Sequence, residues 1–208
     1  MPRTISTKPQ YSIQWWADRA LAAPERNSFE VLRTMLRYRL KEPVPALRGS
    51  VKLCDARVAA RAFPLLKERL SLVVTSPPYL DTTDYTEDQW LRLWFLGGSE
   101  KPRTGANKDD RHTDLDSYWS FLEEAWSGIQ PLVRRGTHVV VRIGGTKVAK
   151  EDLLAGLSSS LGRGLSGYKV KPRDAGETTE IRNRQTNVFR PGTSTGRVEH
   201  DFTFKVTA

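Results

Sequence analysis

The sequence contains a single cysteine, Cys54, and only three histidines among 208 residues. One cysteine excludes an internal disulfide, which is typical of the cytoplasm, where we expect the protein. His112, His138 and His200 are widely spaced and form no metal-ligand pattern with Cys54, so no metal is expected. No apolar run approaches the roughly 18 residues that a membrane span needs, and no basic start followed by an apolar segment indicates export.

Basic residues outnumber acidic residues in the chain. There are 33 Lys and Arg against 24 Asp and Glu, giving a net charge of +9. Such an excess is expected of a protein that binds a polyanion such as nucleic acid, although charge alone does not identify the partner. The length fits one domain with a small appendage. A hydrophobic content of 38%, with six Trp, six Tyr and seven Phe, indicates a folded globule.

The most informative stretch is an apolar run that stops at two consecutive prolines, Leu72-Val-Val-Thr-Ser-Pro-Pro-Tyr79. A short apolar run ended by such a breaker predicts a buried strand with a rigid loop at its carboxyl end. The prolines fix two φ angles and remove two backbone donors. We therefore expect the carbonyls of Ser76 and Pro77 to point outward as free acceptors beside the ring of Tyr79, which suits a planar ligand carrying an amino group. A proline-rich turn after a core strand is the simpler alternative.

Thr75-Ser-Pro-Pro-Tyr79 resembles the catalytic loop of the amino-methyltransferases, Asp/Asn/Ser-Pro-Pro-aromatic. The serine form is typical of N4-cytosine DNA methyltransferases, and N6-adenine enzymes are the near neighbours. The resemblance implies methyl transfer from S-adenosylmethionine to an exocyclic amine, with Ser76, Pro77, Pro78 and Tyr79 as catalytic residues. The Ser76 hydroxyl and the Pro77 carbonyl would hold the amine hydrogens. Tyr79 would stack on a base flipped from double-stranded DNA.

The rest of the chain alternates helical and strand patterns. The sequence predicts helices over 13–21, 29–41, 87–96, 115–130 and 150–161, and strands over 49–54, 71–75, 137–143, 168–171 and 201–206. Residues 58–70 are expected to be a short helical or irregular link. Alternation closed by a hairpin predicts an α/β, doubly wound sheet. The resemblance implies a Rossmann-like S-adenosylmethionine-dependent methyltransferase fold.

One part of that fold is missing from the sequence. The family carries a Phe-x-Gly-x-Gly turn after its first strand, and no segment here has that form. The resemblance therefore covers roughly residues 48–206, with the first βαβ units absent. A sheet that lacks its first strands has an open edge and an uncovered apolar face. We expect a second protein subunit to supply the Gly-rich motif, as in a split methyltransferase.

The chain is accordingly divided into two regions. Residues 1–47 are predicted to be an N-terminal arm with helices, and 48–208 the methyltransferase catalytic region. The adjacent Trp15 and Trp16 cannot both lie on one helical stripe. The helix over 29–41 has a basic outer side. Both features make the first region a candidate partner interface, although packing into a core edge is the alternative.

Further site residues follow from the resemblance. Asp55 resembles the acidic motif that lies near the cofactor's adenine in this family, although an ordinary turn residue would look the same. The predicted cofactor-binding residues are Asp55, Thr75, Gly144 and Gly145. The predicted nucleic-acid-binding residues are Asp84, Tyr85, Arg182, Arg184, Arg190 and Arg197. Arginines in the tail could contact bases or phosphates, or lie on a solvated basic hairpin. Asp84 and Tyr85 could instead shape the loop.

Three functions are compatible with these residues. The first is a DNA methyltransferase of the restriction–modification kind, acting at cytosine N4 or adenine N6 with a partner chain. The second is an RNA base methyltransferase, because RNA enzymes share the loop. The third is an inactive nucleic-acid-binding subunit that supports an active partner. The missing Gly-rich motif favours the third function, whereas the intact Pro-Pro-Tyr loop argues against it.

Overall fold

A computed structural model of the chain describes residues 14–22, 25–43, 46–79, 90–100, 114–144, 148–181 and 197–208. The chain divides into two compact units. One comprises Met1–Lys52 and Asp84–Ala106, and the other comprises Leu53–Thr83 and Asn107–Ala208. Whether residues 1–47 act as a partner-binding arm stays a prediction.

The first unit is helical where it is described. It contains a helical turn at residues 14–17, α2 (Ser28–Arg39) and α5 (Trp90–Phe95). The side chain of Asn27 caps α2 by accepting hydrogen bonds from the amides of Phe29 and Glu30. The predicted helix over 29–41 is confirmed with slightly different ends. No buried residue lies on α2.

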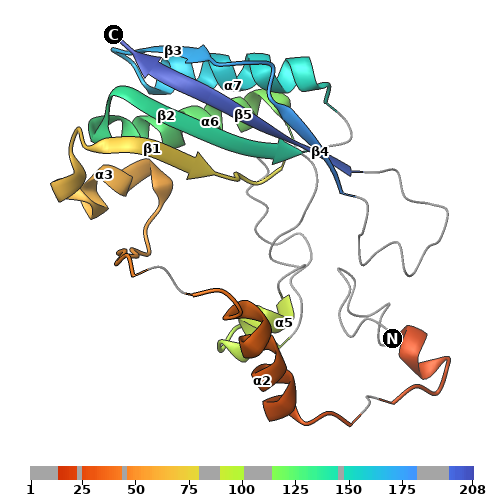
Figure 1. Cartoon of the computed structure of the whole chain (residues 1–208). Coiled ribbons are helices and arrows are strands. Elements are labelled where there is room, and N and C mark those ends of the chain that lie inside the picture. The colour runs from red at the N-terminus through yellow and green to blue at the C-terminus, as the bar shows by residue number, and fades with distance from the viewer. Residues whose placement is uncertain are drawn as a thin grey trace. The chain divides into compact units, whose positions relative to one another are not determined.

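The second unit holds the sheet (Figure 1). Its strands are β1 (Leu70–Thr75), β2 (Val133–Gly144), β3 (Lys169–Pro172), β4 (Glu177–Ile181) and β5 (Arg197–Thr207). The strand order is β1-β2-β5-β3, and β4 also pairs with β5. β1 and β2 are parallel, whereas β5 is antiparallel to β2, β3 and β4. β3 and β4 thus form one interrupted arm of a long hairpin whose other arm is β5.

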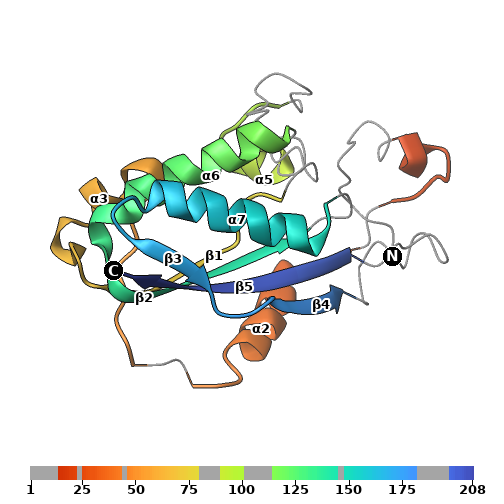
Figure 2. The same cartoon turned by 90° about the horizontal axis from the view of Figure 1, so that it is seen from above.

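Helices connect the strands as α/β folds require. α6 (Leu115–Ile129) and the short η4 (Gln130–Leu132) lie between the parallel strands β1 and β2, and α7 (Lys150–Gly164) follows β2. A parallel pair needs such a crossover connection. Figure 2 shows α6 and α7 on the same face of the sheet. The prediction of an α/β, Rossmann-like fold closed by a hairpin is confirmed, as are the helices over 115–130 and 150–161. The doubly wound part of the prediction is not met by the described residues of this unit, because α6 and α7 both lie on one face of the sheet.

Alternating burial along the strands shows where the core lies. Val139, Val141 and Ile143 on β2 are fully buried beneath the helices, as are Phe202 and Phe204 on β5. Strand residues two apart share a face, so these side chains point to one side of the sheet. The helices contribute Tyr118, Leu122 and Trp126 from α6 and Leu153, Leu157 and Leu161 from α7.

The opposite face of the sheet, here called the open face, is not covered by helices of the second unit among its described residues. Leu72 and Val74 on β1 are 53% and 69% exposed there. β1 is also the edge strand, because among the described residues it pairs only with β2. Within the described part of this unit, the sheet therefore has one packed face, one open face and an exposed edge at β1.

The predicted strand over 49–54 is wrong. These residues form no strand, and Val51 and Leu53 are fully exposed. The chain continues instead through η1 (Ala56–Val58), α3 (Ala59–Ala62) and η2 (Pro64–Leu66), the short helical link that the sequence predicts. The backbone of Ala56 and Arg57 lies directly against Gly128 of α6, where a Cβ atom would clash. Among the described residues, no strand lies beside residues 49–54 to pair with them, so the apolar pattern there does not produce a strand.

Strand boundaries also differ from those predicted. The sequence analysis missed β4, and β5 begins four residues earlier than expected. β2 begins at Val133, four residues before the predicted start at Thr137, because Leu70 pairs with Val133 while Leu72 pairs with His138. The residues between form a bulge with Gly136 at φ +89°, so a turn lies inside the strand. No helix in the described part of the chain is long and apolar enough to cross a membrane.

Candidate active site

The candidate site is the loop that follows β1 at the carboxyl end of the parallel strands. β1 ends at Thr75, and Ser76 to Tyr79 leave the sheet without regular structure. Ser76 is exposed, Pro77 is buried, and Pro78 and Tyr79 are half-buried. The carboxyl ends of parallel strands are where open α/β sheets bind ligands.

The two proline carbonyls of this loop have different surroundings. The carbonyl of Pro78 accepts a hydrogen bond of 2.9 Å from the hydroxyl of Tyr118 on α6. No donor among the described residues makes a hydrogen bond to the carbonyl of Pro77. The loop is thus tied to the core helix at one carbonyl, and the preceding carbonyl is an acceptor without a described partner.

The ring of Tyr79 is held from two sides. Its hydroxyl donates a hydrogen bond of 2.9 Å to Oε1 of Glu199 on β5. Burial raises the pKa of Tyr79 above its ordinary value of 10.0, a hydrogen bond with the Ser76 side chain lowers it, and Glu199 raises it again. The phenol is therefore neutral at physiological pH and serves as a donor and a flat apolar surface.

Gly144, the last residue of β2, lies directly beneath Tyr79. A Cβ atom on Gly144 would lie 3.1 Å from Cε2 of Tyr79 and 2.8 Å from the carbonyl oxygen of Val198. The absence of a side chain lets the ring and β5 approach the end of β2. Gly144, predicted to bind a cofactor, is in this structure the residue against which Tyr79 packs.

Glu199 is in turn linked to charged groups on the open face. The guanidinium of Arg142 lies 3.9 Å from Glu199. It also forms a bidentate pair with Asp201, at 2.7 and 2.5 Å. The bond from Arg142 lowers the pKa of Asp201 below its ordinary value. Arg142 therefore fixes two neighbouring carboxylates of β5, one of which holds Tyr79.

A hollow of about 570 Å³ on the open face adjoins the loop. Apolar and hydroxyl side chains of the sheet form its floor, and charged side chains from β2, β4, β5 and the turn before β4 surround it. It is lined by Val74, Thr75, Ser76, Val140, Arg142, Asp174, Glu177, Asp201 and Thr203. Thr75, predicted to bind a cofactor, and Ser76 thus share this hollow.

Asp55, also predicted to bind a cofactor, is engaged within its own segment. Its carboxylate caps η1 by accepting from the amide of Arg57, and it pairs with the Arg57 guanidinium at 2.6 Å. Arg57 also reaches Glu124 on α6 at 3.2 Å. Asp55 and Glu124 raise the pKa of Arg57. Asp55 therefore anchors the segment before α3 to α6 in this structure.

The remaining predicted site residues fall largely outside the described part of the chain. Outside it lie Gly145, Asp84, Tyr85, Arg182, Arg184 and Arg190. Arg197 is the first residue of β5, and its side chain is not described. Their roles stay predictions. Among the described residues, no group of three or more His, Cys, Asp and Glu side chains could hold a metal ion.

Three residues that the sequence analysis did not assign to the site contribute to it. Tyr118 lies on the predicted helix over 115–130 and is buried, but the helical pattern does not reveal the bond from its hydroxyl to Pro78. Arg142 lies in the predicted strand over 137–143, where alternation could have placed it on the face opposite Val141. Glu199 precedes the predicted start of β5, so no strand pattern indicated its position.

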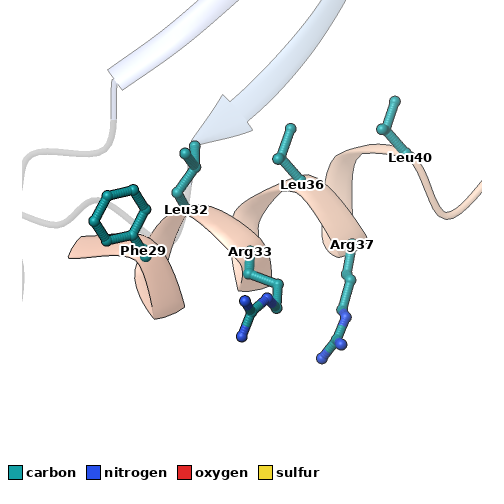
Figure 3. A pocket seen from close by; sticks show the side chains of 6 residues that line it. All are labelled: Phe29, Leu32, Arg33, Leu36, Arg37 and Leu40. Atoms are coloured by element: carbon teal, nitrogen blue, oxygen red, sulfur yellow. The ribbon is translucent and has the colours of Figure 1, made fainter. Parts of the chain in front are cut away.

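The first unit contains a second apolar surface, on α2. Figure 3 shows Phe29, Leu32, Leu36 and Leu40 along one side of the helix, with Arg33 and Arg37 projecting from another side. The four apolar side chains are between 49% and 78% exposed. The predicted amphipathic helix with a basic outer side is thus observed, with its apolar side unburied.

The similarity of this chain to known proteins is found at the level of structure. The sequence matches no protein-family model and no curated protein. It is similar to crystal structures of one protein of Thermus thermophilus, provisionally assigned as a DNA modification methylase. The selenomethionine form, the unmodified form and a complex with S-adenosyl-L-methionine share 16%, 19% and 18% identity with this chain. Each covers 74% of it at a TM-score of 0.37.

The chain spans about half the length of those structures, between 51% and 54%.

Proposed function

We propose that this chain is the catalytic part of an S-adenosylmethionine-dependent amino-methyltransferase that acts on DNA, at cytosine N4 in preference to adenine N6. The observation that carries the proposal is the loop after β1. Its Pro78 carbonyl is bound to Tyr118, its Pro77 carbonyl has no described partner, and Tyr79 is fixed beside them. A neutral acceptor next to a held aromatic ring matches what an exocyclic amine on a planar base requires.

The chemical difficulty of the reaction explains the arrangement. The lone pair of an exocyclic amine is delocalised into the ring, so the nitrogen is a weak nucleophile. Acceptors that bind both amine hydrogens favour a tetrahedral nitrogen and localise the lone pair. The hydroxyl oxygen of Ser76 and the carbonyl of Pro77 are the acceptors available for this. Tyr79 would orient the base by stacking on it, and no covalent intermediate with the protein is needed.

The residues present fit only part of a methyl-donor site. S-adenosylmethionine would supply an electrophilic methyl group to the amine and leave as the thioether S-adenosylhomocysteine, and the methylated nitrogen would release one of its hydrogens as a proton. Thr75 and Ser76 line the hollow beside the loop, whereas Asp55 is paired with Arg57 and Gly144 is covered by Tyr79. The sequence has no Phe-x-Gly-x-Gly turn. These observations support a split arrangement in which a second chain brings that turn and the loop of this chain binds the base.

The test uses this chain together with the product of a neighbouring reading frame that encodes Phe-x-Gly-x-Gly and lacks a Pro-Pro-Tyr loop. Transfer of a labelled methyl group to duplex DNA is measured with the pair and with each chain alone. We expect transfer only with the pair. Full activity of the isolated chain would exclude the split arrangement, and absence of transfer to any DNA by a pair shown to associate would exclude the DNA methyltransferase.

Two substitutions test the loop itself. Ser76→Ala and Tyr79→Ala in the complex are each expected to reduce methyl transfer by at least about tenfold, because one loses an amine acceptor and the other loses the stacking ring. Ser166→Ala and Tyr168→Ala serve as controls of the same types at the opposite end of β2 from the loop, where Ser166 contacts Gln130 and the Tyr168 hydroxyl bonds to Val133. Activity unchanged by both loop substitutions would refute the catalytic assignment.

A further inference from the structure

Three exposed lysines lie on the open face, at the end of the sheet away from the catalytic loop. Alternation along β5 places Lys205 on that face, because its neighbours Phe204 and Val206 are fully buried on the other. Lys205 pairs with Lys171 of β3, and Lys169 lies two residues before Lys171 on the same side. Figure 1 shows this end of β5, marked C, beside β3 and away from β4. Lys169, Lys171 and Lys205 are called the lysine cluster below.

The lysine cluster has no counter-charge in the described part of the chain. None of its side chains forms an ion pair with a described carboxylate. Lys171 and Lys205 lie directly opposite each other on two antiparallel strands, where like charges destabilise a sheet. The other strand neighbour of Lys205 is His138, which brings no negative charge. The cluster is therefore a concentration of positive charge that a bound anion would stabilise.

More basic side chains lie at the same end of the sheet. Arg134 and Arg135 are exposed at the start of β2. The segment 67–69, which precedes β1, runs beside the start of β2 and is joined to residues 131 and 132 by two backbone hydrogen bonds. It adds the exposed side chains of Lys67 and Arg69, with Glu68 as its acid. The positive charge thus extends from β3 across the sheet to the start of β1.

The opposite sign of charge separates this end of the open face from the catalytic loop. Lys205 pairs with His138, which lies six residues, and so about 20 Å, before the loop end of β2. Between Lys205 and the loop, β5 carries Asp201 and Glu199 on the same face, with Arg142 beside them. Two carboxylates against one guanidinium repel phosphate groups. A nucleic acid segment bound at the lysine cluster therefore does not continue over the open face to the loop.

We propose that the lysine cluster and the arginines at the start of β2 form a second binding surface for nucleic acid. It holds the phosphates of a segment other than the one whose base enters the catalytic loop. Neighbouring lysines of the cluster are about 5 and 7 Å apart along the backbone, comparable with the separation of successive phosphates on one strand. Contacts to phosphate carry no sequence information, so this binding is independent of sequence. The surface goes beyond the proposed function, since it keeps the protein on nucleic acid without using the catalytic loop.

An anionic membrane and an acidic protein fit the surface less well. A surface that binds a membrane inserts apolar side chains into the bilayer. The open-face residues beside Lys205 on β5 are instead Thr203 and Thr207, whose hydroxyl groups are of the kind that contacts phosphate oxygens. Protein interfaces are depleted in lysine. The side chains present therefore favour the phosphate backbone of a nucleic acid.

Lysine acetylation followed by mass spectrometry tests the surface without reference to activity. Duplex DNA of arbitrary sequence is expected to slow acetylation of all three cluster lysines by about fivefold or more at low salt, and high salt should abolish the effect. Lys41 and Lys52, exposed lysines of the first unit, should change little. Duplex RNA, anionic phospholipid vesicles and polyglutamate are measured alongside. Protection by DNA or RNA supports the surface. Protection by vesicles or polyglutamate alone, or by none of the four, overturns it.

Substitutions test the surface by affinity. The variant Lys169→Gln, Lys171→Gln and Lys205→Gln is expected to bind duplex DNA about tenfold or more weakly at about 0.1 M salt. Its plot of log affinity against log salt should be shallower by about 2 to 3, because each phosphate contact contributes about 0.9 to the slope. The control is Arg37→Gln, Lys41→Gln and Lys52→Gln, which removes the same charge from the first unit. Circular dichroism establishes that both variants fold. Equal weakening in both, or native affinity in the cluster variant, would refute the surface.

The outcomes separate this inference from the proposed function. With the partner chain and a saturating short duplex, the cluster variant should keep the native kcat for methyl transfer. Ser76→Ala should lose methyl transfer and keep its affinity for DNA of arbitrary sequence. A cluster variant whose kcat falls as far as that of Ser76→Ala would place the lysines in the catalytic site and contradict a second surface. If DNA protects the lysines but no pair methylates DNA, the surface holds and the function is wrong.

Discussion

The hydroxyl of Tyr118 donates a hydrogen bond of 2.9 Å to the carbonyl of Pro78. Tyr118 is fully buried on α6, so it links the loop after β1 to the hydrophobic core. Because proline has no amide hydrogen, the loop cannot be fixed by donors of its own at two successive positions. The core tyrosine supplies a donor instead, and it selects which of the two carbonyls remains available to a substrate.

Replacing Tyr118 by Phe tests this link. The loss of one buried hydrogen bond is expected to lower the free energy of unfolding by about 1 kcal/mol or somewhat more. Methyl transfer by the complex should fall severalfold through kcat, since the loop acceptors lose their fixed position. Urea denaturation and steady-state methylation kinetics measure the two effects.

Tyr168→Phe is the matched control for that substitution. The Tyr168 hydroxyl donates a bond of 3.1 Å to the carbonyl of Val133, at the opposite end of β2 from the loop. Its loss should destabilise the protein by a similar amount and leave kcat unchanged. If both variants reduce kcat equally, Tyr118 has a purely structural role and does not position the loop.

Gly144→Ala tests the packing beneath Tyr79. The added Cβ would lie 2.8 Å from the Val198 carbonyl oxygen and 3.1 Å from Cε2 of Tyr79, so either β5 or the ring must move. Overpacking of this kind costs about 1–3 kcal/mol. Gly162→Ala on α7 is the control, because nothing lies within 4 Å of its Cβ position. It should stabilise the helix by about 0.5–1 kcal/mol. A Gly144→Ala variant with normal stability and activity would refute the close packing.

Much of the fold could be predicted because it depends on local pattern. The apolar run into Thr75, the amphipathic helix over 115–130 and the alternation in β2 each carry their own signal. The hairpin of β3 with β5 was predicted from two short strand patterns, whereas β4 was missed. The strand over 49–54 was mispredicted because an apolar pattern cannot show whether a neighbouring strand is present.

The site could be predicted only where it is contiguous in sequence. Ser76 to Tyr79 form one segment with unusual backbone chemistry, so they stand out. Tyr118 and Glu199 contact the loop across 40 and 120 residues of sequence. Gly144 was noticed as a glycine after a strand, but its contact with Tyr79 arises only from the register of β1, β2 and β5. Contacts of that kind depend on tertiary packing, which one sequence does not encode in any local pattern.

Glu199 is expected to act by orienting Tyr79. Glu199→Ala removes the acceptor of the Tyr79 hydroxyl and should reduce methyl transfer by about threefold to tenfold, the value of one hydrogen bond. Glu199→Gln keeps an acceptor oxygen at the same reach and should restore most of the activity. Methylation rates of the two variants distinguish a role of the Glu199 hydrogen bond from a role of its charge. Equal loss in both would show that the charge of Glu199, rather than its hydrogen bond, is needed.

The pair of Arg142 and Asp201 predicts how stability depends on pH. The bond from Arg142 lowers the pKa of Asp201 below its ordinary value of 3.8. As the pH falls toward 4, Asp201 therefore stays ionised in the folded protein, whereas it begins to take up a proton in the unfolded chain. The pair therefore stabilises the fold above about pH 4, and this contribution is lost as the pH falls through the lowered pKa. Asp201→Asn should cost about 1 kcal/mol at pH 7, since the side chain is partly screened by solvent.

The difference between the native protein and Asp201→Asn should shrink as the pH falls below 4, and urea denaturation between pH 7 and 3 measures it. Arg142→Gln should remove the same pH dependence of the free energy of unfolding. The variant that carries both substitutions should be little less stable than either single variant, because both substitutions remove the same interaction. Strictly additive losses, or a difference that stays constant down to pH 3, would show that the two side chains do not act as a pair.

Because Arg142 also lies 3.9 Å from Glu199, Arg142→Gln alone is expected to reduce methyl transfer slightly through Tyr79. Asp201→Asn leaves Glu199 in place and should reduce transfer less.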